Sequence, residues 1–284
     1  MLQVYFDSNM LFDVLGRRDG LFQRVNAGVA KGLVEVVVSD TNLLELFGGG
    51  DRPSFEREVE RLLLLRPRWA HVAILTQREL STEDAALTSG TTVPPLLIVE
   101  PWGDFLSHVA TSDHEAVLPH DALIPTPEAF AALFATDTLK ERMSFWRAEL
   151  RAVRHRVAEE MAFVRTRRNF YWKTVAYTLR RNFKSTSDLV DLLWGDADRA
   201  PAFRIDFELT MNDLDRHPPK WTTNNFIDHV HARLLPYVHI FVTRDGPFLE
   251  KLRWFDKAVR SASGLVPYGT KICDDWSTVE AQLR

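Results

Sequence analysis

The sequence predicts an α/β fold, a three-layer α/β/α sandwich with a central parallel sheet, interrupted by a mostly helical insertion. Two observations predict it. Short runs of β-forming residues alternate with helical stretches at both ends of the chain, which is the pattern of a parallel sheet covered by helices. The long middle of the chain lacks this alternation. We therefore expect a discontinuous α/β core of residues 1–50 and 205–284 and an insertion of residues 51–204.

The first fifty residues predict a β-α-α-β-α order. Residues 2–6 form an apolar run that ends at Asp7, and residues 34–38 are mostly β-branched, so both are expected to be buried strands. Glycines are expected to end the helices that follow, at Gly16 and at residues 48–50. The expected helices are residues 10–15, 22–31 and 41–47.

The middle of the chain is predicted to be helical where it is regular. Residues 55–65 have the pattern of a helix, whereas residues 85–128 are rich in loops and contain six prolines. Further helices are expected at residues 127–134, 138–183 and 187–194. No strand is expected here, which is why we interpret residues 51–204 as an insertion.

The α/β pattern returns near the end of the chain. A helix that Pro236 stops is expected before a strand, and a turn with the sequence TRDG follows that strand. The expected helices are residues 224–234, 248–259 and 277–283, and the expected strands are residues 238–242 and 268–272. The sheet is thus predicted to be built from both ends of the chain.

Composition indicates an ordinary globular protein. The chain has 284 residues, of which 45% are hydrophobic and 26% charged. It has one cysteine, Cys273, so an intramolecular disulfide and a thiolate-rich zinc site are both excluded. We expect Cys273 to be a small buried residue. No run approaches the roughly 18 apolar residues of a membrane span, so the expectation is a soluble, cytoplasmic protein with no membrane partner.

The charge is distributed unevenly. The formal net charge is -4, but residues 140–184 contain 13 Lys and Arg against 4 Asp and Glu, with aromatic residues between them. Such a segment is suited to RNA, because cations bind phosphates and aromatic rings stack on unpaired bases. The alternative is an amphipathic helical pair whose arginines are simply solvated. The candidate RNA-binding residues are Arg165, Arg167, Arg168, Lys173, Arg180 and Arg181.

Four carboxylates occupy positions next to the predicted strands. Asp7 ends the first strand, Glu45 lies in the helix after the second, Asp228 precedes the late strand, and Asp245 follows it. Sites in open α/β sheets form outside the carboxyl ends of the strands. Carboxylates gathered there repel each other unless a cation neutralises them, and Mg²⁺ prefers such oxygen ligands.

Each acid also has a purely structural interpretation. Asp7 and Asp245 are natural turn or cap residues, Glu45 is favoured in the first turns of a helix, and Asp228 could be a solvated helix residue. His229, His231 and His239 lie near Asp228 in the sequence and could be metal ligands or, more commonly, histidines with structural partners. His231 is expected on the same helix face as Asp228.

Three segments together resemble the PIN-domain family of metal-dependent ribonucleases. They are VYFDSNMLFDVL at residues 4–15, VVVSDTNLLEL at residues 36–46 and NNFIDHVHARLLPYVHIFVTRDGPFLEKL at residues 224–252. The resemblance implies that Asp7, Glu45, Asp228 and Asp245 form the metal site. It also implies supporting roles for Asn9 and Thr243, and Asn225 stands where some members carry another acid. The long insertion departs from the family pattern.

The function implied by this resemblance is a metal-dependent endoribonuclease that uses Mg²⁺ or Mn²⁺ to cleave single-stranded or structured RNA. A homodimer is a further implication, as is a protein inhibitor if the chain is a toxin, although such toxins are usually shorter. RNA processing or defence fits its size as well.

Two other functions remain open from the sequence. One is a non-catalytic RNA-binding or scaffold protein on the same fold. The other is a phosphatase or receiver-like enzyme with Asp7 as covalent nucleophile. The absence of a second aspartate two positions after Asp7 argues against the latter.

Overall fold

The computed structural model describes the two ends of the chain and part of its middle. The described residues are 1–17, 19–39, 41–42, 45–46, 55–70, 72, 75–90, 99–101, 199–216, 223–263 and 269–283. The helices predicted at residues 127–134, 138–183 and 187–194 lie outside these ranges, as do the six candidate RNA-binding residues.

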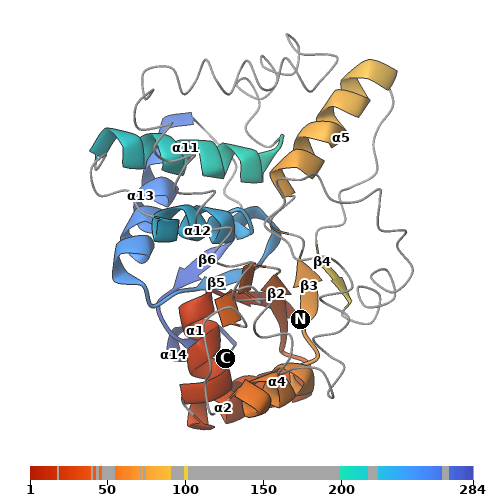
Figure 1. Ribbon diagram of the computed structural model, residues 1–284, viewed down its shortest axis with the longest axis vertical. Coiled ribbons are helices and arrows are strands. Elements are labelled where there is room, and N and C mark those ends of the chain that lie inside the picture. Colours follow the sequence, from red (N-terminus) through yellow and green to blue (C-terminus); the bar gives the residue numbers. More distant parts are fainter. Residues whose placement is uncertain are drawn as a thin grey trace.

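Six strands form one sheet in the order β4-β3-β2-β1-β5-β6 (Figure 1). The strands are β1 (Leu2–Phe6), β2 (Val34–Ser39), β3 (Arg68–Ala70), β4 (Val99–Pro101), β5 (Ile240–Val242) and β6 (Lys271–Cys273). All neighbours pair in parallel except β3 and β4, which are antiparallel. The N-terminal strand β1 lies between β2 and β5, so both ends of the chain contribute to the centre of the sheet, as predicted.

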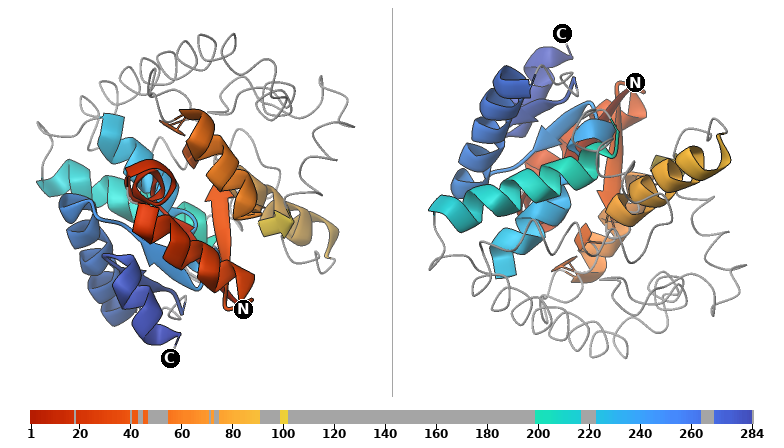
Figure 2. Two further views of the ribbon diagram at one scale, coloured as in Figure 1. Left: turned by 90° about the horizontal axis from the view of Figure 1, so that it is seen from below. Right: turned by 90° about the horizontal axis from the view of Figure 1, so that it is seen from above.

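Helices cover both faces of the sheet and make it the middle of three layers. They are α1 (Ser8–Phe12), the π-helix η1 (Asp13–Arg17), α2 (Asp19–Ala30), α4 (Phe55–Leu64), α5 (Leu75–Ser89), α11 (Pro201–Arg216), α12 (Thr223–Ala232), the 3-10 helix η5 (Leu235–Tyr237), α13 (Gly246–Ser263) and α14 (Trp276–Gln282). Helices α1 and α2 lie on one face, and α11 and α12 lie on the other (Figures 1 and 2). The predicted α/β/α sandwich is therefore confirmed.

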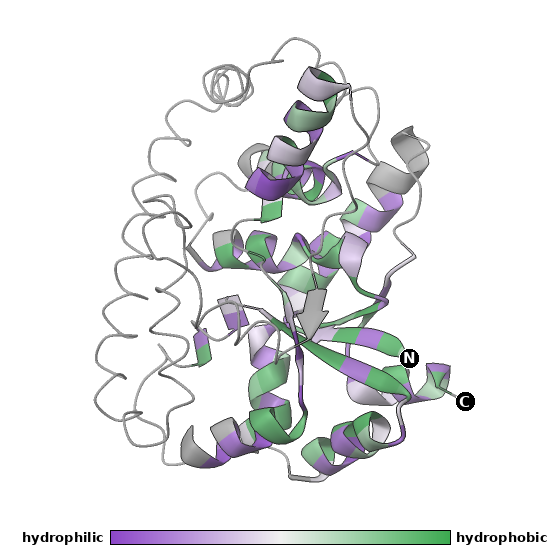
Figure 3. Ribbon diagram, turned by 90° about the vertical axis from the view of Figure 1, so that its right-hand side faces the viewer, coloured by the Kyte–Doolittle hydropathy of each residue, from purple (hydrophilic) through white to green (hydrophobic). Residues whose placement is uncertain are grey.

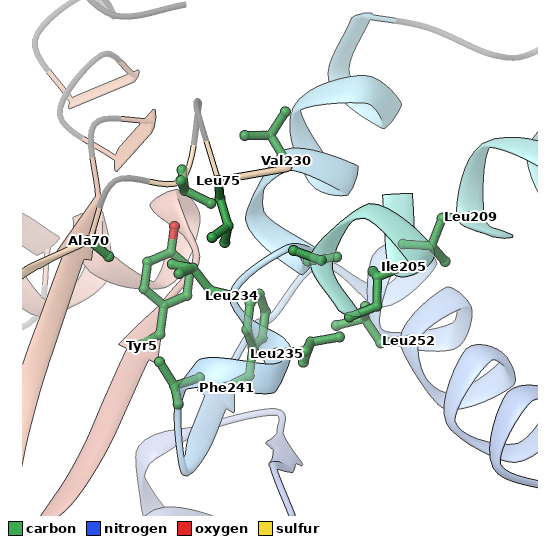
Figure 4. Packing of buried hydrophobic residues seen from close by; sticks show 14 of the residues in the cluster. Tyr5, Ala70, Leu75, Ile205, Leu209, Val230, Leu234, Leu235, Phe241 and Leu252 are labelled. Atoms are coloured by element: carbon green, nitrogen blue, oxygen red, sulfur yellow. The ribbon is translucent and has the colours of Figure 1, made fainter. Parts of the chain in front are cut away.

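Most residues of the central strands are hydrophobic and buried, as a sheet covered by helices on both faces requires (Figure 3). Successive side chains of a strand point to opposite faces. Tyr5 pairs in register with Val37 on one side and Phe241 on the other, and these three side chains join one core cluster. Ile205 and Leu252, from α11 and α13, complete that cluster on the same face of the sheet (Figure 4).

The predicted boundary of the insertion was wrong. Strands β3 and β4 lie within residues 51–204, yet β3 pairs with β2 and β4 pairs with β3. Strand β3 begins with the charged Arg68, and β4 (VEP) ends at a proline in the stretch that was predicted to be loop, so neither was recognised from its pattern. Helix α4 is thus the crossover between two parallel strands, and the described residues among 55–101 belong to the α/β core.

The helix predicted at residues 10–15 continues past Gly16 as a π-helical turn. A side chain at Gly16 would collide with the Glu58 side chain of α4. Arg57 and Arg61 of α4 donate hydrogen bonds to the carbonyl oxygens of Gly16 and Leu15, at 3.1 and 2.9 Å. The glycine therefore permits α4 to approach closely, and the arginines satisfy carbonyls at the end of the turn.

Two predictions from composition can be compared with the described residues. Cys273 is buried, as expected, and burial raises the pKa of its thiol. Among the helices that the structure describes, none combines the length and the apolar character of a membrane span.

Candidate functional site

The site is built at the carboxyl ends of β1 and β5. The pairing of Phe6 with Val242 places the next residues, Asp7 and Thr243, side by side. The Thr243 hydroxyl donates a hydrogen bond to Asp7 Oδ2, and the Met10 amide donates one to Asp7 Oδ1 at 2.8 Å. Asp7 is 4% exposed and Thr243 is fully buried. Asp7 is therefore both the N-cap of α1 and a carboxylate fixed from the neighbouring strand.

Glu45 reaches the same edge of the sheet from the helical residues that follow β2. Its Oε2 lies 2.9 Å from Nε2 of His231, which is on α12. The Ser8 hydroxyl lies 3.3 Å from the same nitrogen. His231 is 2% exposed, so this ion pair is largely shielded from water on the histidine side. It joins the segment after β2 to the helix before β5.

A chain of buried hydrogen bonds continues from the other side of the His231 ring. Its Nδ1 lies 2.5 Å from the Tyr5 hydroxyl, which lies 2.9 Å from Ser39 Oγ. The Ser39 hydroxyl donates to Asn42 Oδ1 at 3.2 Å. The Tyr5 hydroxyl thus bridges the buried ring of His231 and the Ser39 hydroxyl.

The acidic residues around His231 favour the protonated form of its ring. Burial by itself would lower the pKa of His231. The hydrogen bond and charge of Glu45 outweigh that effect, with additional contributions from Asp7 and Asp228, so the pKa is raised from its ordinary value.

Asp228 and Asp245 complete the group of four acids. Burial, together with the negative charges of Asp245 and Glu45, raises the pKa of Asp228 to about 8, against the opposing charges of His231 and Lys251. Burial also raises the pKa of Asp7, and Glu45 adds to that effect. Glu45 thus acts on both Asp7 and Asp228, and Asp245 acts on Asp228.

Asp245 also has a structural role. Its Oδ1 accepts a hydrogen bond from the Phe248 amide at 2.9 Å, which caps α13, and its own amide donates to Thr243 Oγ1 at 3.1 Å. Arg244 pairs with Asp13 at 3.0 Å and ties this loop to the helices after β1. The predicted turn therefore holds Asp245 in a fixed position.

The predicted supporting residues fare differently. Thr243 was matched to a hydroxyl residue that accompanies the last acid; its hydroxyl bonds to Asp7, and it also accepts the Asp245 amide. Asn9 is exposed on α1, and the described partners of the Asp7 carboxylate are Met10 and Thr243. Asn225 is half-buried in the first turn of α12. The six basic candidates lie outside the described residues.

Sequence reasoning missed most of the hydrogen-bond chain around His231. The spacing of Asp228 and His231 gave the only signal, a shared helix face. Asn42 was not considered, yet it also donates to the Phe6 carbonyl oxygen at 3.1 Å and so links the ends of β1 and β2. The motif Ser39-x-x-Asn42, directly after a strand, could have indicated it.

The donor set suits a hard divalent cation by its chemistry. It consists of four carboxylates, and Mg²⁺ and Mn²⁺ favour such ligands. Among the described residues, however, no three His, Cys, Asp or Glu side chains stand in a ready metal-binding arrangement. The metal site therefore stays a prediction.

Comparisons of the chain with protein-family models, with curated proteins and with solved structures found no match.

Proposed function

We propose that this protein is a PIN-like, metal-dependent endoribonuclease that hydrolyses phosphodiester bonds in single-stranded or structured RNA. Asp7, Glu45, Asp228 and Asp245 would hold Mg²⁺ or Mn²⁺ at the carboxyl edge of the sheet. A bound cation of this kind activates water and stabilises the charge that develops on the phosphate. The residues of the chain fix the carboxylates and supply the negative charge that attracts the cation.

The observation that carries the proposal is the burial of Asp228 beside other acids. The other three acids have partners that explain them without a ligand, since Asp7 and Asp245 cap helices and Glu45 pairs with His231. Asp228 lies in the middle of α12, where burial and two neighbouring acids raise its pKa to about 8. Gathering carboxylates in this way is unfavourable for folding, and such perturbed groups mark candidate functional sites.

The substrate and setting follow from the basic residues and the composition. Arg165, Arg167, Arg168, Lys173, Arg180 and Arg181 would bind RNA phosphates. We place the enzyme in the cytoplasm, because it relies on no disulfide. A homodimer and, for a toxin, an inhibitor protein are further partners that the PIN resemblance suggests.

Cleavage of end-labelled single-stranded RNA tests the proposal. Full-length protein is assayed with Mn²⁺, with Mg²⁺ and with EDTA, beside Asp7→Asn and the control Asp275→Asn. Both aspartates follow a strand and cap a helix, and asparagine caps equally well. We expect metal-dependent cleavage that falls by about 100-fold or more in Asp7→Asn, because a metal-site charge is lost, and is unchanged in Asp275→Asn.

The second candidate is a non-catalytic RNA-binding protein on the same fold. It is favoured by the structural partners of three of the acids and by the lack of a ready metal site among the described residues. RNA binding without cleavage under any of the three conditions would support it. If the protein neither binds nor cleaves RNA, both candidates are contradicted.

A further inference from the structure

A buried aspartate outside the acidic group joins three helices. Asp213 of α11 is 3% exposed, and its Oδ2 lies 3.0 Å from His229 Nε2 on α12. The same oxygen accepts a hydrogen bond from Lys251 Nζ on α13 at 2.7 Å. Thr210, one turn earlier on α11, lies 3.3 Å from His229 Nδ1. Both nitrogens of the buried imidazole are thus bonded to α11.

The two helices held by Asp213 carry two of the four acids. His229 directly follows Asp228 on α12, so the bond that fixes His229 also fixes the backbone next to Asp228. Helix α13 begins directly after its cap, Asp245. Lys251 interacts with acids on both neighbouring helices. It bonds to Asp213 on α11, and its charge lowers the pKa of Asp228 on α12.

Stability alone is a weak explanation for these buried charges. Apolar residues already pack α11, α12 and α13 together, among them Leu209, Val230 and Leu252. Replacing a buried ion pair with apolar residues is often neutral or stabilising. A polar contact with fixed geometry, in contrast, determines how one helix sits against the next, and outer residues of this kind orient the ligands of metal sites.

We propose that Asp213, acting through His229 and Lys251, is a positioning residue that sets the spacing between Asp228 and Asp245 for cation binding. This inference rests on the proposed function, because it presumes that the acids bind a divalent cation.

The test measures Mn²⁺ affinity of the full-length protein by calorimetry. The double variant Asp213→Asn with Lys251→Met removes the ion pair without changing net charge. Loss of the Lys251 charge, which acts on Asp228, would by itself favour a bound cation, so weaker binding arises from geometry. The matched control is Asp206→Asn with Arg233→Met. It breaks another ion pair between α11 and the end of α12, at 3.1 Å, and the charge of Arg233 acts on Glu79, away from the four acids.

We expect the Asp213/Lys251 variant to bind Mn²⁺ about tenfold more weakly, as loss of residues that orient metal ligands does, and the control to stay within about twofold. Thermal unfolding of both variants is recorded in parallel. If the double variant does not unfold cooperatively, His229→Leu and His229→Gln carry the test. The leucine variant should lose about tenfold in affinity, and the glutamine variant, which keeps an N–H donor, should retain most of it.

The outcomes separate this inference from the proposed function. Wild-type protein that binds Mn²⁺, with equal effects in the Asp213/Lys251 variant and the control, would overturn the positioning role alone. Equal affinity in His229→Leu and His229→Gln would overturn it in the same way. Wild-type protein that neither binds Mn²⁺ nor cleaves RNA would overturn the metal site itself, and the positioning role with it.

Discussion

Tyr5 is the residue through which the central strand contacts the acidic group. Its ring packs in the core against Phe241 with ring centroids 5.3 Å apart, while its hydroxyl lies between Ser39 and His231. A buried hydroxyl is unfavourable unless it is hydrogen-bonded, and here it is bonded on both sides. One side chain therefore serves the core and also orients the histidine that pairs with Glu45.

Tyr5→Phe should destabilise the fold. It keeps the ring but leaves Ser39 and His231 each without one partner in a buried place, which is expected to lower the free energy of unfolding by about 1–3 kcal/mol. Urea denaturation measures the change. A loss under about 0.5 kcal/mol, as for an ordinary surface substitution, would mean that water replaces the hydroxyl.

At the scale of elements, Glu79 joins α5 to the start of α11. It is 3% exposed and accepts hydrogen bonds at 2.9 Å from the amides of Ala202 and Phe203, as well as one from the Tyr237 hydroxyl. These amides belong to the first turn of α11, which lacks partners within its own helix. A second pair, Arg199 with Glu83 at 2.9 Å, lies beside this contact. The two helices are thus joined where the described chain resumes at residue 199.

This contact predicts a pH-dependent stability. Burial raises the pKa of Glu79 from 4.5 to about 7, against the effect of its hydrogen bonds. A raised pKa means that the folded state holds the proton more tightly than the unfolded state. The contribution to stability is therefore present in full below pH 4.5 and is lost as pH rises through about 7. At about 1.4 kcal/mol per pKa unit, it amounts to about 3 kcal/mol.

The glutamine variant isolates this contribution. Glu79→Gln mimics the protonated side chain, so the free energy of unfolding of wild type minus that of the variant should fall as pH rises from 4.5 to about 7. Chemical denaturation across this pH range measures it. A difference that stays constant or rises with pH would contradict the assignment.

At the scale of the whole molecule, the sequence predicted the elements that have a clear local pattern. Residues of β1, β2 and β5 form apolar runs, so the central sheet and the acids at its carboxyl edge could be located. Strands β3 (RWA) and β4 (VEP) have no such run within their residues and depend on pairing with a neighbour, which no local pattern reveals. The contact of Tyr5 with His231 spans 226 positions. Tyr5 has the sequence pattern of an ordinary strand residue, so its polar role appears only in the folded chain.

The uneven charge of the chain predicts which residues bind RNA. The chain has a formal net charge of -4, so phosphate affinity must come from a local excess of cations such as that of residues 140–184. Neutralising Arg165, Arg167 and Arg168 to Gln should weaken RNA binding and, at about 0.7 per phosphate contact, reduce the slope of log affinity against log salt by about 2.

The control removes three exposed cations of the α/β core, Lys31, Arg253 and Lys257, and so changes the net charge equally. Fluorescence anisotropy of labelled single-stranded RNA across a salt series measures both slopes. If both triple variants lose the same affinity, net charge alone governs binding and the basic segment has no specific role. If only the control weakens, the RNA lies over the α/β core instead.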